Sequence, residues 1–241
     1  MQIQEHTLVG DIAAGSAAAA TVLEKYGIDY CCGGKRTLED ACRETGVPAA
    51  KIRNELASAV ADPATRAIDW NTASLEALIH HIVTTHHEYL KLELPRVGQR
   101  VRTVVAVHGE KDPAALHELD MVYQGMSEEL NLHMHKEEMM LFPMIERMEA
   151  FVQNQRSLPM MPFGTIRNPI GVMEREHDSA GTALTRIRDL TLGFQAPPYA
   201  CSTYLAMLEG LKALEADLHL HIHLENNILF PRAIALEQNA R

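Results

Sequence analysis

The larger, second part of the chain shows a helical pattern of apolar and polar positions. From residue 74 onward apolar side chains recur every three or four residues, as in Leu75, Leu78 and Ile79, which is the spacing of one face of an α-helix. No segment there alternates strictly between apolar and polar residues as a half-buried strand would. Glycine and proline interrupt the pattern at 109–113, 159–168 and 193–198. The pattern predicts four long helices, over 74–107, over 113–149, from 168 onward and over 198–236.

Four long helices with short to moderate connections favour an all-α fold with an up-down-up-down four-helix bundle. The third helix begins well, because Asn168 can cap it and Pro169 can occupy its first helical position. In such a bundle, side chains from facing helices can converge on a ligand.

A small helical module precedes the bundle. Residues 11–26 are rich in alanine and predict a helix that Gly27 ends. Thr37 begins a capping-box pattern that opens a second helix, and a third helix is expected over about 48–60. We therefore divide the chain into an N-terminal helical module at 1–62, a linker at 63–73 and a helical domain at 74–237.

The composition excludes several classes of protein. Of 241 residues, 46% are hydrophobic and 22% charged, so the chain can bury an ordinary core and is not disordered. A net charge of −10 without a Lys/Arg cluster argues against a nucleic-acid partner. No apolar run reaches the ~18 residues of a membrane span, and residues 1–12 lack the basic segment of a secretion signal. With only four cysteines, we expect a cytoplasmic protein that has no disulfide framework and no membrane contact.

One sequence pattern occurs twice, 88 residues apart. His133 is followed by Glu137 and then by Leu-Phe-Pro, and His221 is followed by Glu225 and the same three residues. Residues four apart on a helix share a face, so each pair presents an imidazole and a carboxylate to one point. A single pair of this kind is usually a solvated surface pair. Its recurrence with the same apolar residues behind it predicts a metal site instead.

Histidines on the other two helices complete the predicted ligand set. The helix from 168 onward offers only His177. On the helix over 74–107, His87 lies on a more apolar stripe than His86 does. His87 and His177 are 90 residues apart, close to the interval of the repeated pair, which indicates two similar helical hairpins. The predicted metal ligands are His87, His133, Glu137, His177, His221 and Glu225.

The other histidines near the repeat do not share its spacing. His219 has no histidine at the matching position of the first copy, and neither His135 nor His223 is followed by a carboxylate four residues later. We interpret all three as surface residues or as neighbours of the ligands. His108 lies about 31 Å beyond His87 along a straight helix and is left outside the ligand set.

Four imidazoles and two carboxylates suit a pair of bridged metal ions, each with two histidines and with both glutamates shared. Mixed nitrogen and oxygen ligation without thiolate favours iron or manganese over structural zinc. Such a ligand set leaves room for an oxo or hydroxo bridge and for a small external ligand. We expect the function to depend on the coordination position that this external ligand would occupy.

The chain resembles a known family. The His-x-x-x-Glu pairs in a bundle resemble the haemerythrin-like fold and differ from the Glu-x-x-His motif of ferritin-like di-iron proteins. The segments Tyr-Gly-Ile-Asp-Tyr-Cys-Cys-Gly-Gly-Lys at 26–35, Glu-His-Asp at 176–178 and Leu-Glu-Asn-Asn-Ile-Leu-Phe-Pro at 224–231 resemble the repair-of-iron-centres (RIC) di-iron family, the ScdA/YtfE/DnrN/NorA type. The resemblance covers nearly the whole chain. The chain departs from the family in its additional Cys42 and in a longer connection at 151–168.

The resemblance implies a haemerythrin-like domain that holds a bridged pair of iron ions on the six ligands named above. It also implies a cytoplasmic homodimer that repairs iron–sulfur proteins damaged by nitric oxide or oxidative stress. Such a protein would release iron, or bind and reduce nitric oxide, at the di-iron centre, the latter as a nitric oxide reductase. The alternative is a carrier or sensor that binds nitric oxide or O2 reversibly without turnover. A di-iron oxygenase is less favoured because the sequence indicates no substrate-sized apolar pocket.

The adjacent Cys31 and Cys32 could be buried or incidental. Two basic residues at 35 and 36, with flanking glycines, indicate instead an accessible thiol pair whose thiolate form is favoured. On that basis the pair is a candidate for a redox, persulfide or iron-transfer role. Cys42 and Cys201 are interpreted as packing residues.

Overall fold

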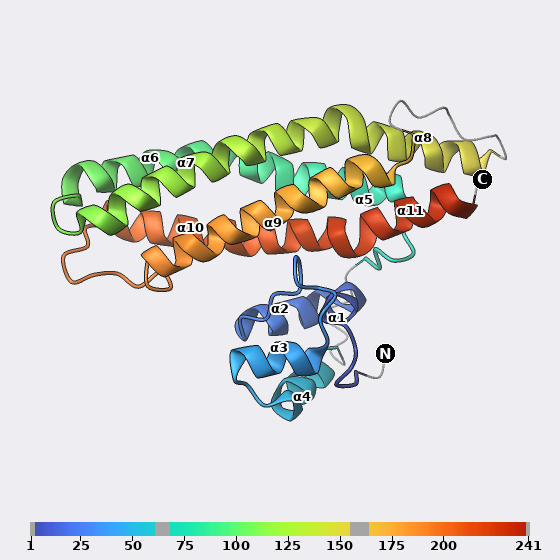
Figure 1. Ribbon diagram of the computed structural model, residues 1–241, viewed down its shortest axis with the longest axis horizontal. Helices are drawn as coiled ribbons and strands as arrows, with labels where there is room; N and C mark the ends of the chain where they lie inside the picture. Colours follow the sequence, from blue (N-terminus) through green and yellow to red (C-terminus); the bar gives the residue numbers. More distant parts are fainter. Residues whose placement is uncertain (1–2, 61–67, 155–163, 240–241) are drawn as a thin grey trace. The chain divides into compact units, whose positions relative to one another are not determined.

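The computed structural model is built of helices (Figure 1). It describes residues 3–60, 68–154 and 164–239. Within these ranges there is no β-strand, only an isolated bridge between Leu8 and Thr37, so the predicted all-α class is confirmed. The chain divides into two compact units, which we name the bundle unit (His81–Pro143 and Gly171–Leu218) and the terminal unit (Met1–His80, Met144–Ile170 and His219–Arg241).

The bundle unit contains long stretches of four helices that lie alongside one another (Figure 1). They are α6 (Glu88–His108), α7 (Pro113–Lys136), α9 (Arg167–Leu190) and α10 (Ser202–His223). Their apolar faces meet in one core, which includes Leu94, Leu119 and Leu184. Gly210 lets α10 approach α6 closely, because a Cβ at this position would stand 2.8 Å from a methyl carbon of Val97. The predicted helical bundle is confirmed.

Local cap chemistry sets the connections of the bundle unit. The Asp112 side chain accepts a hydrogen bond from the backbone N–H of Ala115 at 3.2 Å, and Pro113 occupies the first helical position of α7. After α9, Gly193 adopts a left-handed φ of 70°, which a glycine tolerates at the end of a helix. The first connection, at 109–112, is short, and the second, at 191–201, is of moderate length, so each joins two neighbouring helices of opposite direction.

The terminal unit contains shorter helices from three stretches of sequence. Its N-terminal part has a core of its own that includes Val9, Leu23 and Leu56. As predicted, Thr37 caps a helix by accepting from the N–H of Asp40 at 3.1 Å. The helices that lie wholly or mostly in this unit are α1 (Val9–Gly15), α2 (Ala17–Lys25), α3 (Leu38–Thr45), α4 (Ala49–Val60), α5 (Leu75–His81), α8 (Phe142–Gln153) and α11 (Phe230–Asn239).

Several predicted helix ends differ from the structure. The helix expected over 11–26 is two helices, because Ser16 is extended (φ −170°, ψ 131°) and its carbonyl accepts the first hydrogen bonds of α2. Asn168 does not cap α9, which already begins at Arg167. The helix expected from 198 begins at Ser202, because the carbonyl of Pro197 first closes a turn with the N–H of Ala200 at 2.9 Å.

Two predicted features lie partly outside the described residues. These are the linker, through residues 61–67, and the long connection, through residues 155–163. Among the residues that are described, no helix is both long enough and apolar enough to cross a membrane.

Three of the predicted long helices contain a π-helical turn. The turns are η2 (Ile82–His87), η3 (Glu137–Leu141) and η4 (Leu224–Leu229). Each turn contains one predicted metal ligand, and π turns of this kind occur frequently at functional sites because they insert a residue and rotate the side chains that follow. Pro143 and Pro231 each stand two residues after a turn, where the missing N–H fits an already irregular backbone. Apolar periodicity did not predict these turns, since the residues on both sides still face the core.

Candidate metal centre

The bundle unit brings together four of the predicted ligands. They are His87 at the end of η2, His133 in α7, Glu137 at the start of η3 and His177 in α9, and each is at most 2% exposed. Nε2 of His133 lies 3.0 Å from Nε2 of His177 and 3.2 Å from Oε2 of Glu137. Nε2 of His87 lies 3.5 Å from that same oxygen. Three ring nitrogens and one carboxylate therefore face one small space.

Glu137 is the carboxylate in the middle of this group. It is 0% exposed, and neither of its oxygens receives a hydrogen bond from the described residues. A buried carboxylate in this position costs several kcal/mol unless a cation offsets its charge. Imidazole nitrogens with a carboxylate suit iron and other first-row divalent metals. The residues present therefore fit a metal ion at this position.

A second carboxylate stands behind each of two ligand imidazoles. Nδ1 of His87 lies 2.8 Å from Oε1 of Glu138, and Nδ1 of His133 lies 2.9 Å from Oε2 of Glu176. A proton on each Nδ1 donates to that carboxylate, so the Nε2 lone pair is directed toward Glu137. Such partners fix the ring orientation and make the ligand nitrogen more basic.

Two lysines hold these outer carboxylates. Nζ of Lys91 donates to the oxygens of Glu138 at 2.7 and 2.9 Å, and Lys136 donates to Glu176. Burial alone would raise the pKa of both carboxyl groups, but hydrogen bonds from the lysines and histidines outweigh burial and lower both pKa values. Sequence reasoning missed Glu138 and Glu176. The available signal was that each directly adjoins a predicted ligand in sequence.

Replacing Glu176 with glutamine should weaken metal binding by about 10- to 100-fold. A neutral amide holds the Nδ1 proton of His133 less strongly, so the ring loses part of its basicity and its fixed orientation. Competition with a chromophoric chelator measures the affinity. Asp178→Asn is the matched control, because Asp178 is exposed on the same helix. Equal losses in the two variants would show that the effect is not due to the contact with His133.

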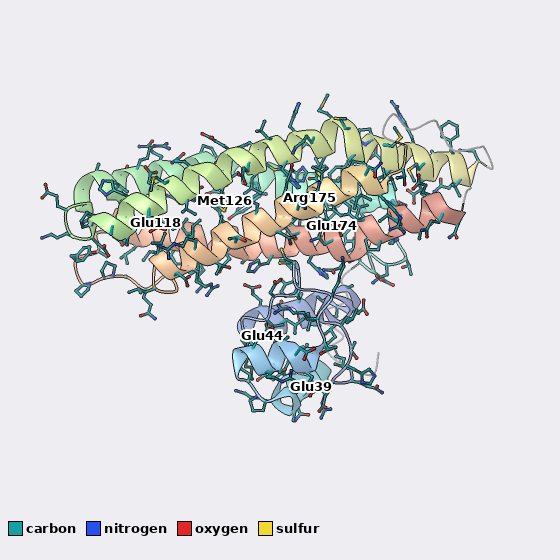
Figure 2. All side chains as sticks on the ribbon, in the orientation of Figure 1. Glu39, Glu44, Glu118, Met126, Glu174 and Arg175 are labelled. Atoms are coloured by element: carbon teal, nitrogen blue, oxygen red, sulfur yellow. The ribbon has the colours of Figure 1, made fainter. Side chains whose placement is uncertain are left out.

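A small cavity adjoins His133. Its volume is about 10 Å³, and its lining includes Leu130, Glu176 and Met126, which Figure 2 labels on α7. That volume accommodates about one water molecule. Its lining includes Glu176, which contacts Nδ1 of His133, but neither Glu137 nor His177, so the cavity lies on the outer side of the His133 ring.

The terminal unit holds the second His-x-x-x-Glu pair. His221 lies in the last turn of α10 and Glu225 in η4, and they are 1% and 0% exposed. Nε2 of His221 lies 3.0 Å from Oε1 of Glu225. Both copies of the repeat thus bury an imidazole beside a carboxylate, and each carboxylate lies in a π turn.

The neighbouring histidines have other partners. His86 is buried, and its Nδ1 lies 2.9 Å from Oδ1 of Asp217. His135 is exposed, as expected for a surface residue. Nδ1 of His219 lies 2.9 Å from Oε2 of Glu24. His219 is therefore part of a contact between α2 and α10 within the terminal unit.

Contacts in the terminal unit also join residues 30–34, which include Cys31 and Cys32, to η4. Nδ2 of Asn227 donates to the carbonyl of Tyr30 at 3.0 Å and lies 2.9 Å from Nδ1 of His223. Burial lowers the pKa of His223 to about 4, so its neutral ring can accept the hydrogen bond from Asn227. A Cβ on Gly34 would stand only 2.6 Å from Oδ1 of Asn227, so this close approach requires a glycine.

The environment of Cys31 and Cys32 differs from the one predicted. Asp29 Oδ1 accepts from the backbone N–H groups of both cysteines at 3.1 and 3.0 Å and lies 3.3 Å from Sγ of Cys31. The hydrogen bond to Cys32, burial and the nearby Asp29 carboxylate raise the pKa of Cys31. The prediction of a favoured thiolate is therefore wrong for Cys31, which is buried. Arg36 pairs instead with Glu44, labelled in Figure 2.

Two family models match the chain. Residues 5–60 match ScdA_N, described as a domain of unknown function (DUF542), and residues 78–233 match the hemerythrin HHE cation binding domain. The chain is also 39% identical over 229 residues to the iron-sulfur cluster repair protein YtfE of Escherichia coli O8 (strain IAI1) and of Shigella boydii serotype 4 (strain Sb227). Each alignment covers 95% of this chain and 97% of the relative.

Proposed function

The chain belongs to the iron–sulfur cluster repair family of the YtfE type, and from this membership we propose that it repairs iron–sulfur clusters damaged by nitric oxide or oxidative stress. We propose that its buried histidines and glutamates hold a bridged pair of iron ions, from which iron is released or at which nitric oxide is bound and reduced. The observation that carries the proposal is Glu137, a fully buried carboxylate that faces imidazole nitrogens and receives no hydrogen bond from the described residues.

In the proposed centre the histidines are divided between the ions and the glutamates are shared. The ions would be held by His87, His133, His177 and His221, two to each, together with Glu137 and Glu225. The repeat supports equivalent roles for the two glutamates, because both His-x-x-x-Glu pairs are buried and both carboxylates lie in π turns.

Residues around the proposed ligands orient the histidine nitrogens for reversible metal binding. When bound, ferrous iron would supply a labile ion and a coordination position for nitric oxide. Glu138 and Glu176 keep the Nδ1 protons of their histidines in place, so the Nε2 atoms stay available as donors. The adjoining lysines keep these carboxylates ionised.

We propose that Cys31 and Cys32 transfer iron or redox equivalents. Together with Asp29 they offer three donor atoms within 4.8 Å of one another. Asn226, which directly follows Glu225, donates to the carbonyl of Cys31 at 3.5 Å, so the segment is anchored beside a proposed ligand. The raised pKa of Cys31 keeps its thiol protonated, and the thiol would lose this proton on binding a metal.

We further propose that the protein acts in the cytoplasm as a homodimer, with damaged iron–sulfur proteins as partners and nitric oxide as a small ligand. The support is the family membership and the name of the relatives. Sedimentation velocity of the iron-loaded protein tests the dimer.

Two activities measured in parallel test the proposed function. Wild type should reactivate apo-aconitase, and formation of nitrous oxide from nitric oxide under anaerobic conditions would assign reduction as well as iron release. Glu137→Ala should lose both activities, and Cys31→Ala tests the thiols. Loss in the glutamate variant alone would remove the thiols from the mechanism. A wild-type protein that binds nitric oxide reversibly but does neither would establish the carrier or sensor instead.

A further inference from the structure

Cys201 and His108 form a close pair in the bundle unit. Nε2 of His108 lies 3.2 Å from Sγ of Cys201. The interpretation of Cys201 as a packing residue is wrong, because Cys201 is exposed. It stands directly before α10, which begins at Ser202. His108 is about 31 Å from His87 along a straight helix. The pair is therefore separate from the proposed metal ligands.

Two tyrosines hold the His108 ring in place. Its centroid lies 5.8 Å from the ring of Tyr199 and 5.7 Å from the ring of Tyr204, which meets it edge-on. His108 is also the last residue of α6, so its backbone belongs to a helix. The imidazole thus packs against two aromatic rings while its Nε2 faces the thiol.

The start of α10 adds a second stabilising influence on the thiolate. The carbonyl of Cys201 accepts the hydrogen bond from the N–H of Leu205 at 3.0 Å, so Cys201 occupies the position just before the helix. Hydrogen bonds from His108 first, and then from the backbone of Tyr204 and Thr203, lower the pKa of Cys201 from 9.0 to about 7. Helix N-termini and basic neighbours are the usual causes of such a low thiol pKa.

The other cysteines have different surroundings. Cys31 and Cys42 are buried, and Cys32 is partly exposed. Burial raises the pKa of Cys42, and the pKa of Cys31 is also raised. Because attack requires an accessible thiolate, Cys201 is the cysteine best placed for nucleophilic chemistry at neutral pH.

We propose that Cys201 is a redox-modifiable nucleophile that forms a mixed disulfide with small-molecule disulfides of the glutathione disulfide class, and that His108 accepts its proton. Sγ attacks one sulfur of the disulfide, so that a new S–S bond forms on Cys201 while the original S–S bond breaks. The departing thiolate takes up the proton that His108 holds. The small disulfide is the oxidant and is reduced to one thiol, and no other reactant is needed.

The rate of mixed-disulfide formation at Cys201 should rise with pH around a midpoint near 7. Incubation of the iron-loaded protein with glutathione disulfide, followed by mass spectrometry of the Cys201 peptide, measures this rate. At pH 7 about half of such a thiol is thiolate, against about 1% for a pKa of 9. A thiolate with a pKa of 7 is about tenfold less nucleophilic than one with a pKa of 9, so the reaction rate at pH 7 is about fivefold higher for the thiol of lower pKa.

His108→Phe separates this proposal from a purely structural role. Phenylalanine keeps an aromatic ring against Tyr199 and Tyr204, but Nε2 is lost. The variant should react more slowly at pH 7, by up to about fivefold, and faster at pH 10, by up to about tenfold, because a higher pKa gives fewer but more nucleophilic thiolates. A change in access alone would move both rates in the same direction. His117→Phe, at an exposed histidine of α7, should match wild type.

Three results would overturn the proposal. They are a wild-type midpoint near 9, a midpoint that does not move in His108→Phe, and modification located on Cys32 instead of Cys201. If His108→Phe alters the far-ultraviolet circular dichroism or the iron content, His108→Gln replaces it. Glutamine also removes the ionisable ring, so the same upward shift of the midpoint is expected.

Discussion

Replacing Glu137 with alanine should release both proposed iron ions rather than one, so that the iron content falls from about two per chain to near zero. Glu137 is one of the two carboxylates that we assign to both ions, and its Oε2 lies within 3.5 Å of ring nitrogens of His87 and His133. Cluster repair should be lost with the iron. Colorimetric iron analysis after anaerobic reconstitution, with apo-aconitase reactivation on the same samples, checks both.

Glu225→Ala tests whether the two copies of the repeat serve one centre. If both glutamates are shared, each single variant loses both ions and the double variant loses nothing further, because residues that act as a unit are not additive. Single variants that each retain about one iron, with complete loss only in the double variant, would mean two independent sites. His135→Ala is the control, since this exposed histidine lies in the same helix as His133, and it should keep the wild-type iron content.

Removing iron should lower the free energy of unfolding by about 4 kcal/mol, taking free metal at about a thousandfold above its Kd as the reference. For a chain of this size the Tm should fall by about 8–16 °C. The physical reason is that buried donors such as Glu137, which is 0% exposed, lose the cation that offsets their burial. Thermal unfolding of iron-loaded and chelator-stripped protein, followed by circular dichroism, measures the difference.

In the metal-free protein, Glu137→Gln should raise the free energy of unfolding, whereas removing iron from wild type lowers it. The amide removes a buried charge, so the metal-free variant should exceed metal-free wild type by about 1–3 kcal/mol. Added iron should then give little or no rise in Tm. Glu209→Gln, on the exposed side of α10, should change neither value. A metal-free Glu137→Gln that melts below wild type and still responds to iron would contradict the assignment of Glu137 as a ligand.

The helical architecture could be predicted because its causes are local. Apolar spacing and caps such as Thr37 and Asp112 act within a few residues of one another. The break at Ser16 was missed, because a short alanine-rich stretch favours helix on both sides of it. The π turns were missed as well, since one inserted residue barely changes the apolar pattern that periodicity detects.

The surroundings of the candidate ligands could not be predicted in the same way. The His-x-x-x-Glu pairs are visible because four residues separate their members. By contrast, Glu138 meets His87 across 51 residues of sequence, and Glu176 meets His133 across 43. No spacing rule connects groups so far apart, so only packing reveals them.

The sequence alone therefore determined the helical class, the repeat and the side chains suited to hold metal, since periodicity and spacing report what neighbouring residues do on one helix. The tertiary structure decided which ring nitrogen of His133 faces Glu137, why the pKa of Cys31 is raised and why that of Cys201 is lowered. These properties depend on burial and on partners distant in sequence, as His108 is from Cys201 at 93 residues. Packing sets both the local dielectric and the hydrogen-bond partners that shift a pKa.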